Sequence, residues 1–262
     1  MLLEIVVQRR FISLDYSEEK RRLNTTGVRD MPFNKGDFVL IEYTVRVKET
    51  GALLDTTSAE LAKQENIYDA NKLYGPTLIV LGKNWINSIV EEWILNANEN
   101  SEGEIEVPPS KAFGERDPSK VKVFSLRELV RRGYTPSIGD VVEINGAQGI
   151  VKQISGGRVI VDFNHPLAGK TLVYKVKVVK KLEGFEEKAK ALSSRHLRIP
   201  QEEITVNYDE SEKKLVITVP GKYVSRGDIN FAKITLTRDV FELFKDQVSV
   251  LVFNEVFKRP QS

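Results

Sequence analysis

The sequence has no cysteine and only two histidines among its 262 residues. Without cysteine, the chain has no disulfide, no thiol nucleophile and no cysteine-ligated metal. His165 and His196 stand far apart in the sequence, so they lack the close spacing that is typical of a zinc or nickel site. We therefore expect a protein that uses neither a metal ion nor any other cofactor.

A surplus of one charge and a long apolar run are also missing. Lys and Arg number 39 and Asp and Glu number 37, a net charge of +2, so the composition predicts no binding to nucleic acid or to an anionic membrane. No apolar run approaches the ~20 residues that span a bilayer. Residues 1–7 are apolar but too short for a signal peptide. We expect a soluble, cytoplasmic protein.

The length is enough for two or three domains. Residues 1–32 give no clear helix or strand pattern, and we expect them to form an N-terminal extension. Met31 and Pro32 directly precede a clean strand pattern. Two interpretations follow: Met31 is the authentic start, or the first thirty residues are a loosely held extension.

Apolar periodicity predicts an α+β unit after this extension. Apolar residues alternate through the first strand, and Gly51 provides a turn before the second. Helices are predicted where apolar residues recur at a spacing of three to four. The predicted elements are strands at 38–47, 52–56, 78–81 and 104–107, and helices at 59–73 and 85–95.

Residues 117–161 read as an insertion. Ser125 is placed to cap a helix at 126–132. Short strands then follow, and they are separated by Asn145-Gly146 and Gly156-Gly157, which are strong hairpin signals between β-branched residues. This segment predicts a compact β-rich module without an evident catalytic group.

The segment 164–170 is a turn-forming cluster, and an alternating strand follows it at 171–179. Gly169-Lys170-Thr171 looks like the end of a phosphate-binding loop. Such a loop needs glycine at the position of Asn164, and it needs a helix to follow it. A strand follows here, so the sequence does not predict nucleotide binding.

Residues 185–262 predict a separate α+β unit. Its last strand is apolar on both faces, and such a strand needs cover on each. We expect this unit either to pair with a second copy or to offer a surface to client chains; the alternative is that its own helices supply the cover. The predicted elements are helices at 185–197 and 238–245, and strands at 204–208, 214–219, 231–237 and 248–257.

The ordered motifs of residues 36–183 resemble the FKBP-type prolyl isomerases, specifically the SlyD-like and long archaeal members. The motif residues are Gly36-Asp37, Tyr43, Gly51, Leu54-Asp55, Leu81-Gly82, the helix at 90–95, the run 112–117 and the segment 164–170.

This resemblance implies an α+β fold in which an FKBP-like antiparallel sheet packs on a short helix. It implies an isomerase domain at 33–116 and 162–183, and an inserted chaperone module, called the insert-in-flap domain, at 117–161. A C-terminal α+β domain at 185–262 would follow, the unit for which the apolar last strand already suggests a homodimer as one option. Unfolded or proline-containing polypeptides are the implied partners.

The resemblance also implies a set of site residues. Its catalytic positions fall on Tyr43, Asp55 and Phe113. Its substrate-binding positions fall on Leu54, Ile86, Asn87, Val90, His165, Leu167 and Tyr174.

Five positions depart from the family pattern, which has glycine at Ile89 and Asn96, often an aromatic residue at Leu54, isoleucine at Asn87, and tyrosine at Phe113. Two functions therefore stay open. The first is an isomerase that also acts as a folding chaperone. The second is a non-catalytic chaperone or scaffold with a decayed pocket.

Overall fold

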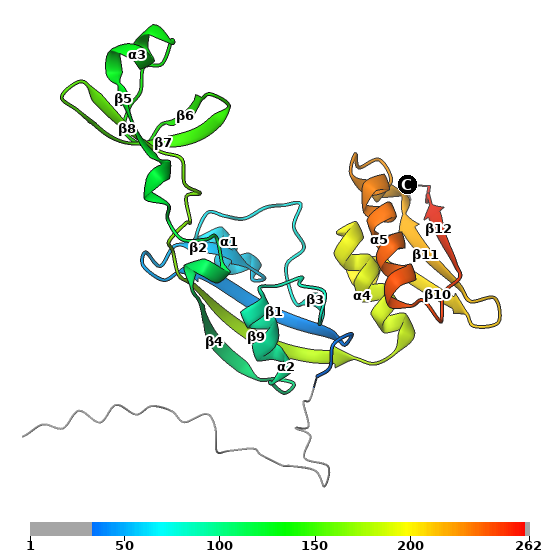
Figure 1. Ribbon diagram of the computed structural model, residues 1–262. Coiled ribbons are helices and arrows are strands. Elements are labelled where there is room, and N and C mark those ends of the chain that lie inside the picture. Colours follow the sequence, from blue (N-terminus) through cyan, green and yellow to red (C-terminus); the bar gives the residue numbers. More distant parts are fainter. Residues whose placement is uncertain (1–32, 260–262) are drawn as a thin grey trace, which may run out of the picture.

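The computed structural model describes residues 33–259, and these contain three sheets (Figure 1). The expected N-terminal extension and the question of Met31 lie outside the described residues. The predicted α+β class, with an inserted β-rich module and a C-terminal α+β part, is confirmed.

The first sheet has five strands. Its main path runs in the order β2-β1-β9-β4, and β3 pairs with the beginning of β1. All of these pairs are antiparallel. Its strands are β1 (Phe38–Val47), β2 (Leu53–Thr56), β3 (Thr77–Val80), β4 (Glu102–Val107) and β9 (Leu172–Leu182).

The core of this unit lies between the sheet and the helix α2 (Ser88–Leu95). Alternate residues of β1 point inward, so Val39, Ile41 and Val45 are buried against Val90 and Ile94 of the helix. Asn87 caps α2, so the helix begins three residues later than the sequence pattern predicted. The helix α1 (Ala59–Gln64) ends nine residues before its predicted end.

The inserted segment forms a four-stranded sheet in the order β5-β8-β7-β6, which projects away from the first sheet (Figure 1). It has its own small core around Leu129, Val151 and Val161. The Asn145-Gly146 and Gly156-Gly157 turns join its antiparallel strands as predicted. Its elements are β5 (Val121–Ser125), α3 (Leu126–Arg131), β6 (Val141–Ile144), β7 (Ala147–Ser155) and β8 (Arg158–Asp162).

The two chain segments that lead into and out of this module are bonded to each other. Arg116 donates from Nη2 to Asp162 Oδ2 at 2.7 Å. The Asn164 side chain accepts from the Asp117 N–H and donates to the Asp117 carbonyl, both at 2.9 Å. Short 3-10 turns flank the first segment, η1 (Pro109–Lys111) and η2 (Pro118–Lys120). The four residues Arg116, Asp117, Asp162 and Asn164, called the clamp below, therefore fix the base of the module.

The C-terminal part is a three-stranded sheet in the order β10-β11-β12, with β11 and β12 parallel. Two helices, α4 and α5, pack against each other and share a core with this sheet. Its elements are α4 (Phe185–Leu197), η3 (Gln201–Glu203), β10 (Thr205–Asp209), β11 (Lys214–Pro220), η4 (Gly221–Tyr223), α5 (Ile229–Leu243) and β12 (Val250–Val256).

The predicted strand at 231–237 is wrong. These residues belong to α5, which also contains most of the helix predicted at 238–245. Their β-branched residues favour a strand locally. The buried side chains Ile229, Ala232, Leu236 and Val240 recur at helical spacing, so packing against the sheet overrides that preference.

The C-terminal part is not separated from the first sheet. Phe38, Leu78 and Val80 are buried in the same apolar cluster as the cores of α4 and α5. The Phe38 ring stacks on Phe244 with centroids 5.5 Å apart. Because this contact is apolar and continuous, α4 is held against one edge of the first sheet, next to β3.

Candidate functional site

A cleft of about 660 Å³ opens beside β1, between the loop that precedes α2 and the loops at 112–113 and 167. Most of the residues predicted for the site come together on its walls. These are Tyr43, Leu54, Asp55, Ile86, Asn87, Phe113, Leu167 and Tyr174.

Two predicted residues are not on the walls. Val90 is fully buried in the core, where Tyr43 and Ile86 pack against the same cluster. His165 stacks flat on the Phe113 ring with centroids 4.6 Å apart. His165 Nδ1 also accepts a hydrogen bond from the Leu167 N–H at 3.2 Å. His165 therefore orients two wall residues from outside the cleft.

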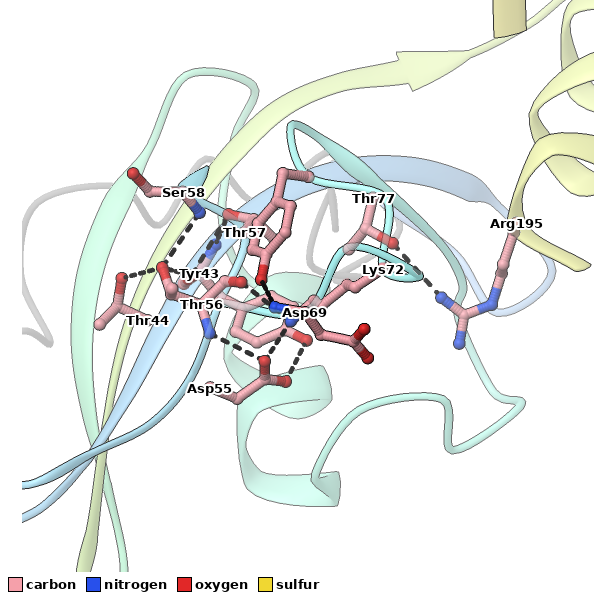
Figure 2. Close-up of polar contacts among 11 residues, drawn as sticks. Tyr43, Thr44, Asp55, Thr56, Thr57, Ser58, Asp69, Lys72, Thr77 and Arg195 are labelled. Atoms are coloured by element: carbon pink, nitrogen blue, oxygen red, sulfur yellow. Dashed lines mark hydrogen bonds and ion pairs between the residues drawn. The ribbon is translucent and has the colours of Figure 1, made fainter. Parts of the chain in front are cut away.

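A polar network holds the Asp55 carboxylate (Figure 2). The Tyr43 hydroxyl donates to Asp55 Oδ2 at 2.7 Å, and the Thr56 N–H donates to Asp55 Oδ1 at 2.8 Å. Lys72 forms an ion pair with Oδ1 of the same carboxylate, and it donates to the Thr56 carbonyl at 2.9 Å. No motif in the sequence points to Lys72, because it lies in an irregular loop whose path depends on tertiary contacts.

The two tyrosines of the cleft are neutral hydroxyls. Burial, and then the hydrogen bond to Asp55, raise the pKa of Tyr43 well above its usual value. Burial, and then the charge of Asp55, raise the pKa of Tyr174. Both residues therefore stay protonated near neutral pH and line the cleft as neutral side chains rather than as bases.

Asn87 uses its side chain to build the loop. Its Oδ1 accepts from the Ile89 N–H at 3.0 Å, which caps α2, and its Nδ2 donates to the Lys111 carbonyl at 2.7 Å. Within residues 33–259, no group accepts a hydrogen bond from the Asn87 backbone N–H. The backbone donor thus stands at the cleft without a protein partner.

Sequence reasoning missed eight further wall residues. Trp85 was predicted as part of a helix but lies in the loop before α2. Arg195 comes from α4, far along the chain, and its guanidinium carbon lies 4.5 Å from the Trp85 ring centroid. Nothing local in the sequence links α4 to this cleft. The eight are Val45, Thr77, Ile79, Asn84, Trp85, Ala112, Leu172 and Arg195.

Within residues 33–259, no group of three or more His, Asp or Glu side chains is placed to hold a metal ion. None of the helices in this part of the chain has both the length and the apolar character needed to cross a membrane.

Comparison with known proteins identifies the family. Residues 122–167 match the family model described as the FKBP26 IF domain. The chain is 30% identical over 163 residues to the SlyD FKBP-type isomerase of Treponema pallidum, covering 59% of this chain and 81% of that protein. It is 28% identical over 144 residues to a short-type peptidyl-prolyl isomerase of Methanocaldococcus jannaschii, covering 55% of this chain and 90% of that protein.

A third relative is the FKBP-type 16 kDa isomerase of Escherichia coli, 28% identical over 146 residues, which cover 54% of this chain and 88% of that protein. The chain belongs to the FKBP-type peptidyl-prolyl cis-trans isomerase family. Its segment at 122–167 is of the insert-in-flap type. The resemblance that the ordered motifs predicted is therefore confirmed.

Proposed function

We propose that this protein catalyses the cis-trans isomerisation of Xaa-Pro bonds in polypeptides. The observation that carries the proposal is the cleft itself, where Tyr43, Phe113 and Tyr174 form an aromatic enclosure. Beside them stands the unpartnered N–H of Asn87. The catalytic roles of Tyr43, Asp55 and Phe113 are part of this proposal.

The chemistry fits such a cleft. Rotation about a peptide bond has a barrier of about 18–20 kcal/mol, and no covalent bond is broken. A nucleophile is therefore not needed. Moving the amide out of water disfavours its charge-separated resonance form, which lowers the barrier. The aromatic walls hold the proline ring, and the Asn87 N–H is placed to bind a substrate carbonyl.

We also propose that the inserted module binds unfolded chains. Several of its apolar side chains stay exposed although the module has its own core. Single exposed apolar residues are ordinary on a protein surface, but these four all lie in one small module: Val123 and Val141 in its strands, Val130 in α3 and Ile138 in a turn. The exposed residues are Val123, Val130, Ile138 and Val141.

The second candidate function is a chaperone without isomerase activity. Phe113 lacks the hydroxyl that the family pattern has at this position, and its side chain is exposed at the mouth of the cleft. An isomerisation assay on a short proline peptide, run beside suppression of aggregation, separates the two. Rates equal to those in buffer, together with intact suppression of aggregation, would establish the second function.

We propose a division into an isomerase domain (33–116 and 162–183), an inserted domain (117–161) and a C-terminal domain (185–262). The three sheets support this division. We further propose that the C-terminal domain pairs with a second copy. The Phe231 and Phe257 side chains there are 75% and 71% exposed. Large apolar side chains that are exposed to this extent favour an interaction surface.

A further inference from the structure

The C-terminal domain contributes one charged side chain to the isomerase cleft. Arg195 leaves α4 and points toward Thr77 (Figure 2). Its Nη1 donates to the Leu78 carbonyl at 2.9 Å and lies 3.4 Å from Thr77 Oγ1. The guanidinium also lies over the ring of Trp85. These contacts fix its position at the wall of the cleft.

Most of the donors of this guanidinium remain available. A guanidinium carries five N–H groups in a planar fork. Within residues 33–259, only Nη1 of Arg195 donates a hydrogen bond; Nε and Nη2 have no acceptor. Neither nitrogen is sealed from solvent, because the one unsatisfied buried side-chain atom in that part of the chain is Nε2 of His196. Both nitrogens are therefore accessible, and Arg195 lines the cleft.

Arg195 also forms no ion pair with any of residues 33–259, because no carboxylate among them lies within ion-pair distance of it. Asp55, the carboxylate on the cleft wall, pairs with Lys72. Asp239 acts on Arg195 only from beyond ion-pair distance, because its carboxylate contacts His196 and Arg238. Burial lowers the pKa of Arg195 from its ordinary value. A half-buried cation without a partner is costly, and a bound carboxylate would remove that cost.

We propose that Arg195 determines substrate specificity by pairing with an acidic side chain next to the proline of a bound peptide. The inference rests on the proposed function of the cleft. Asp55 is paired with Lys72, which lies outside the cleft lining, so Arg195 is the wall residue whose charge has no ion-pair partner among the described residues. A planar guanidinium binds a carboxylate through two parallel hydrogen bonds, which also selects its orientation.

The test measures binding and isomerisation separately. The peptides carry Glu, Gln or Lys beside the proline and are otherwise identical. In one series this residue precedes the proline, and in a second series it follows the proline. Each peptide is titrated into the full-length protein by calorimetry. Isomerisation of the same peptides is followed by NMR exchange. We expect the protein to bind the Glu peptide about five- to tenfold more tightly than the Gln peptide in at least one series, and the Lys peptide least tightly.

Three variants locate the effect. Arg195→Met should abolish the preference for Glu, and Arg195→Lys should retain part of it, because a single ammonium cannot make the bidentate contact. Lys245→Met removes an exposed positive charge from the same domain and should leave the preference unchanged. If Arg195→Met fails to fold, Arg195→Lys and the loss of preference in high salt decide the question.

Equal affinity of the unmodified protein for the Glu and Gln peptides would overturn the proposal. So would a preference that survives in Arg195→Met, or an equal loss for all three peptides, which would indicate that Arg195 binds a peptide carbonyl instead. A preference for Glu in binding without isomerisation of any peptide would refute the proposed catalytic function and leave this inference intact.

Discussion

Acid should loosen the base of the inserted module through one carboxylate. Asp162 is only 8% exposed and accepts four hydrogen bonds at the clamp. Two come from the Arg116 guanidinium and two from the backbone and side-chain amides of Asn164. Protonation removes the charge that makes these bonds strong. The experiment lowers the pH and compares the stability of the natural protein with that of the Asp162→Asn variant.

The size of the effect follows from the pKa. Burial by itself raises the pKa of Asp162, but the bonds from Asn164 and Arg116 lower it more, from 3.8 to about 2. The folded pKa is therefore below the unfolded pKa. The stabilisation is fully present above pH 3.8 and is lost as the pH falls through the folded value. A difference of nearly two pKa units corresponds to about 2 kcal/mol.

The assay is urea unfolding between pH 5 and pH 2.5, with hydrogen exchange to locate the loss. We expect the natural protein to lose about 1.6 kcal/mol relative to Asp162→Asn over this range, because pH 2.5 is still above the folded pKa of about 2. Amides near the clamp should lose protection first. Glu143→Gln removes an exposed carboxylate of the same module and should follow the natural protein. Parallel stability curves for the natural protein and Asp162→Asn would refute this reasoning.

Four further outcomes are expected. Tyr43→Phe removes the hydrogen bond to Asp55 and should slow peptide isomerisation by about tenfold while aggregation suppression is unchanged; equal loss of both activities would make Tyr43 structural. Replacing residues 121–160 by a short glycine linker should abolish most aggregation suppression and spare peptide isomerisation, and a deletion protein that suppresses aggregation normally would place client binding elsewhere. Removing residues 185–262 uncovers buried apolar side chains of the first sheet and should cost roughly 5 kcal/mol of stability in urea unfolding; an unchanged midpoint would contradict the shared core. Phe231→Asp should halve the mass seen by light scattering at micromolar concentration, and a monomeric natural protein would remove the pairing proposal.

The sequence predicted those parts of the fold that depend on local patterns. The alternation of residues 38–47 and the turn at Asn145-Gly146 specify a strand and a hairpin without help from distant residues. The α5 helix was misread, because its β-branched residues favour a strand until the packing of Leu236 and its neighbours is known. Tertiary packing decides such conflicts.

The site divides in the same way. Tyr43 and Asp55 lie on adjacent strands within the ordered motifs, and the structure brings them into contact. Lys72 and Arg195 carry no motif, because an irregular loop places the first and a helix of another domain places the second. Sequence spacing contains no information about either position. Lys72 nevertheless pairs with Asp55, and Arg195 lines the cleft.

The clamp has a consequence for how a long client would reach the cleft. The module is attached by two bonded chain segments instead of one flexible linker, so its reach is set by geometry. In the proposed function, the exposed apolar side chains of the module hold one segment of a client. Only some prolines of that client then have a high effective concentration at the cleft. Those prolines lie at a chain distance from the held segment that matches the span from module to cleft. Prolines that lie closer to the held segment than this span cannot reach the cleft. Prolines that lie farther away reach it less often. The order in which the prolines of a client are isomerised would therefore depend on which segment of the client the module binds.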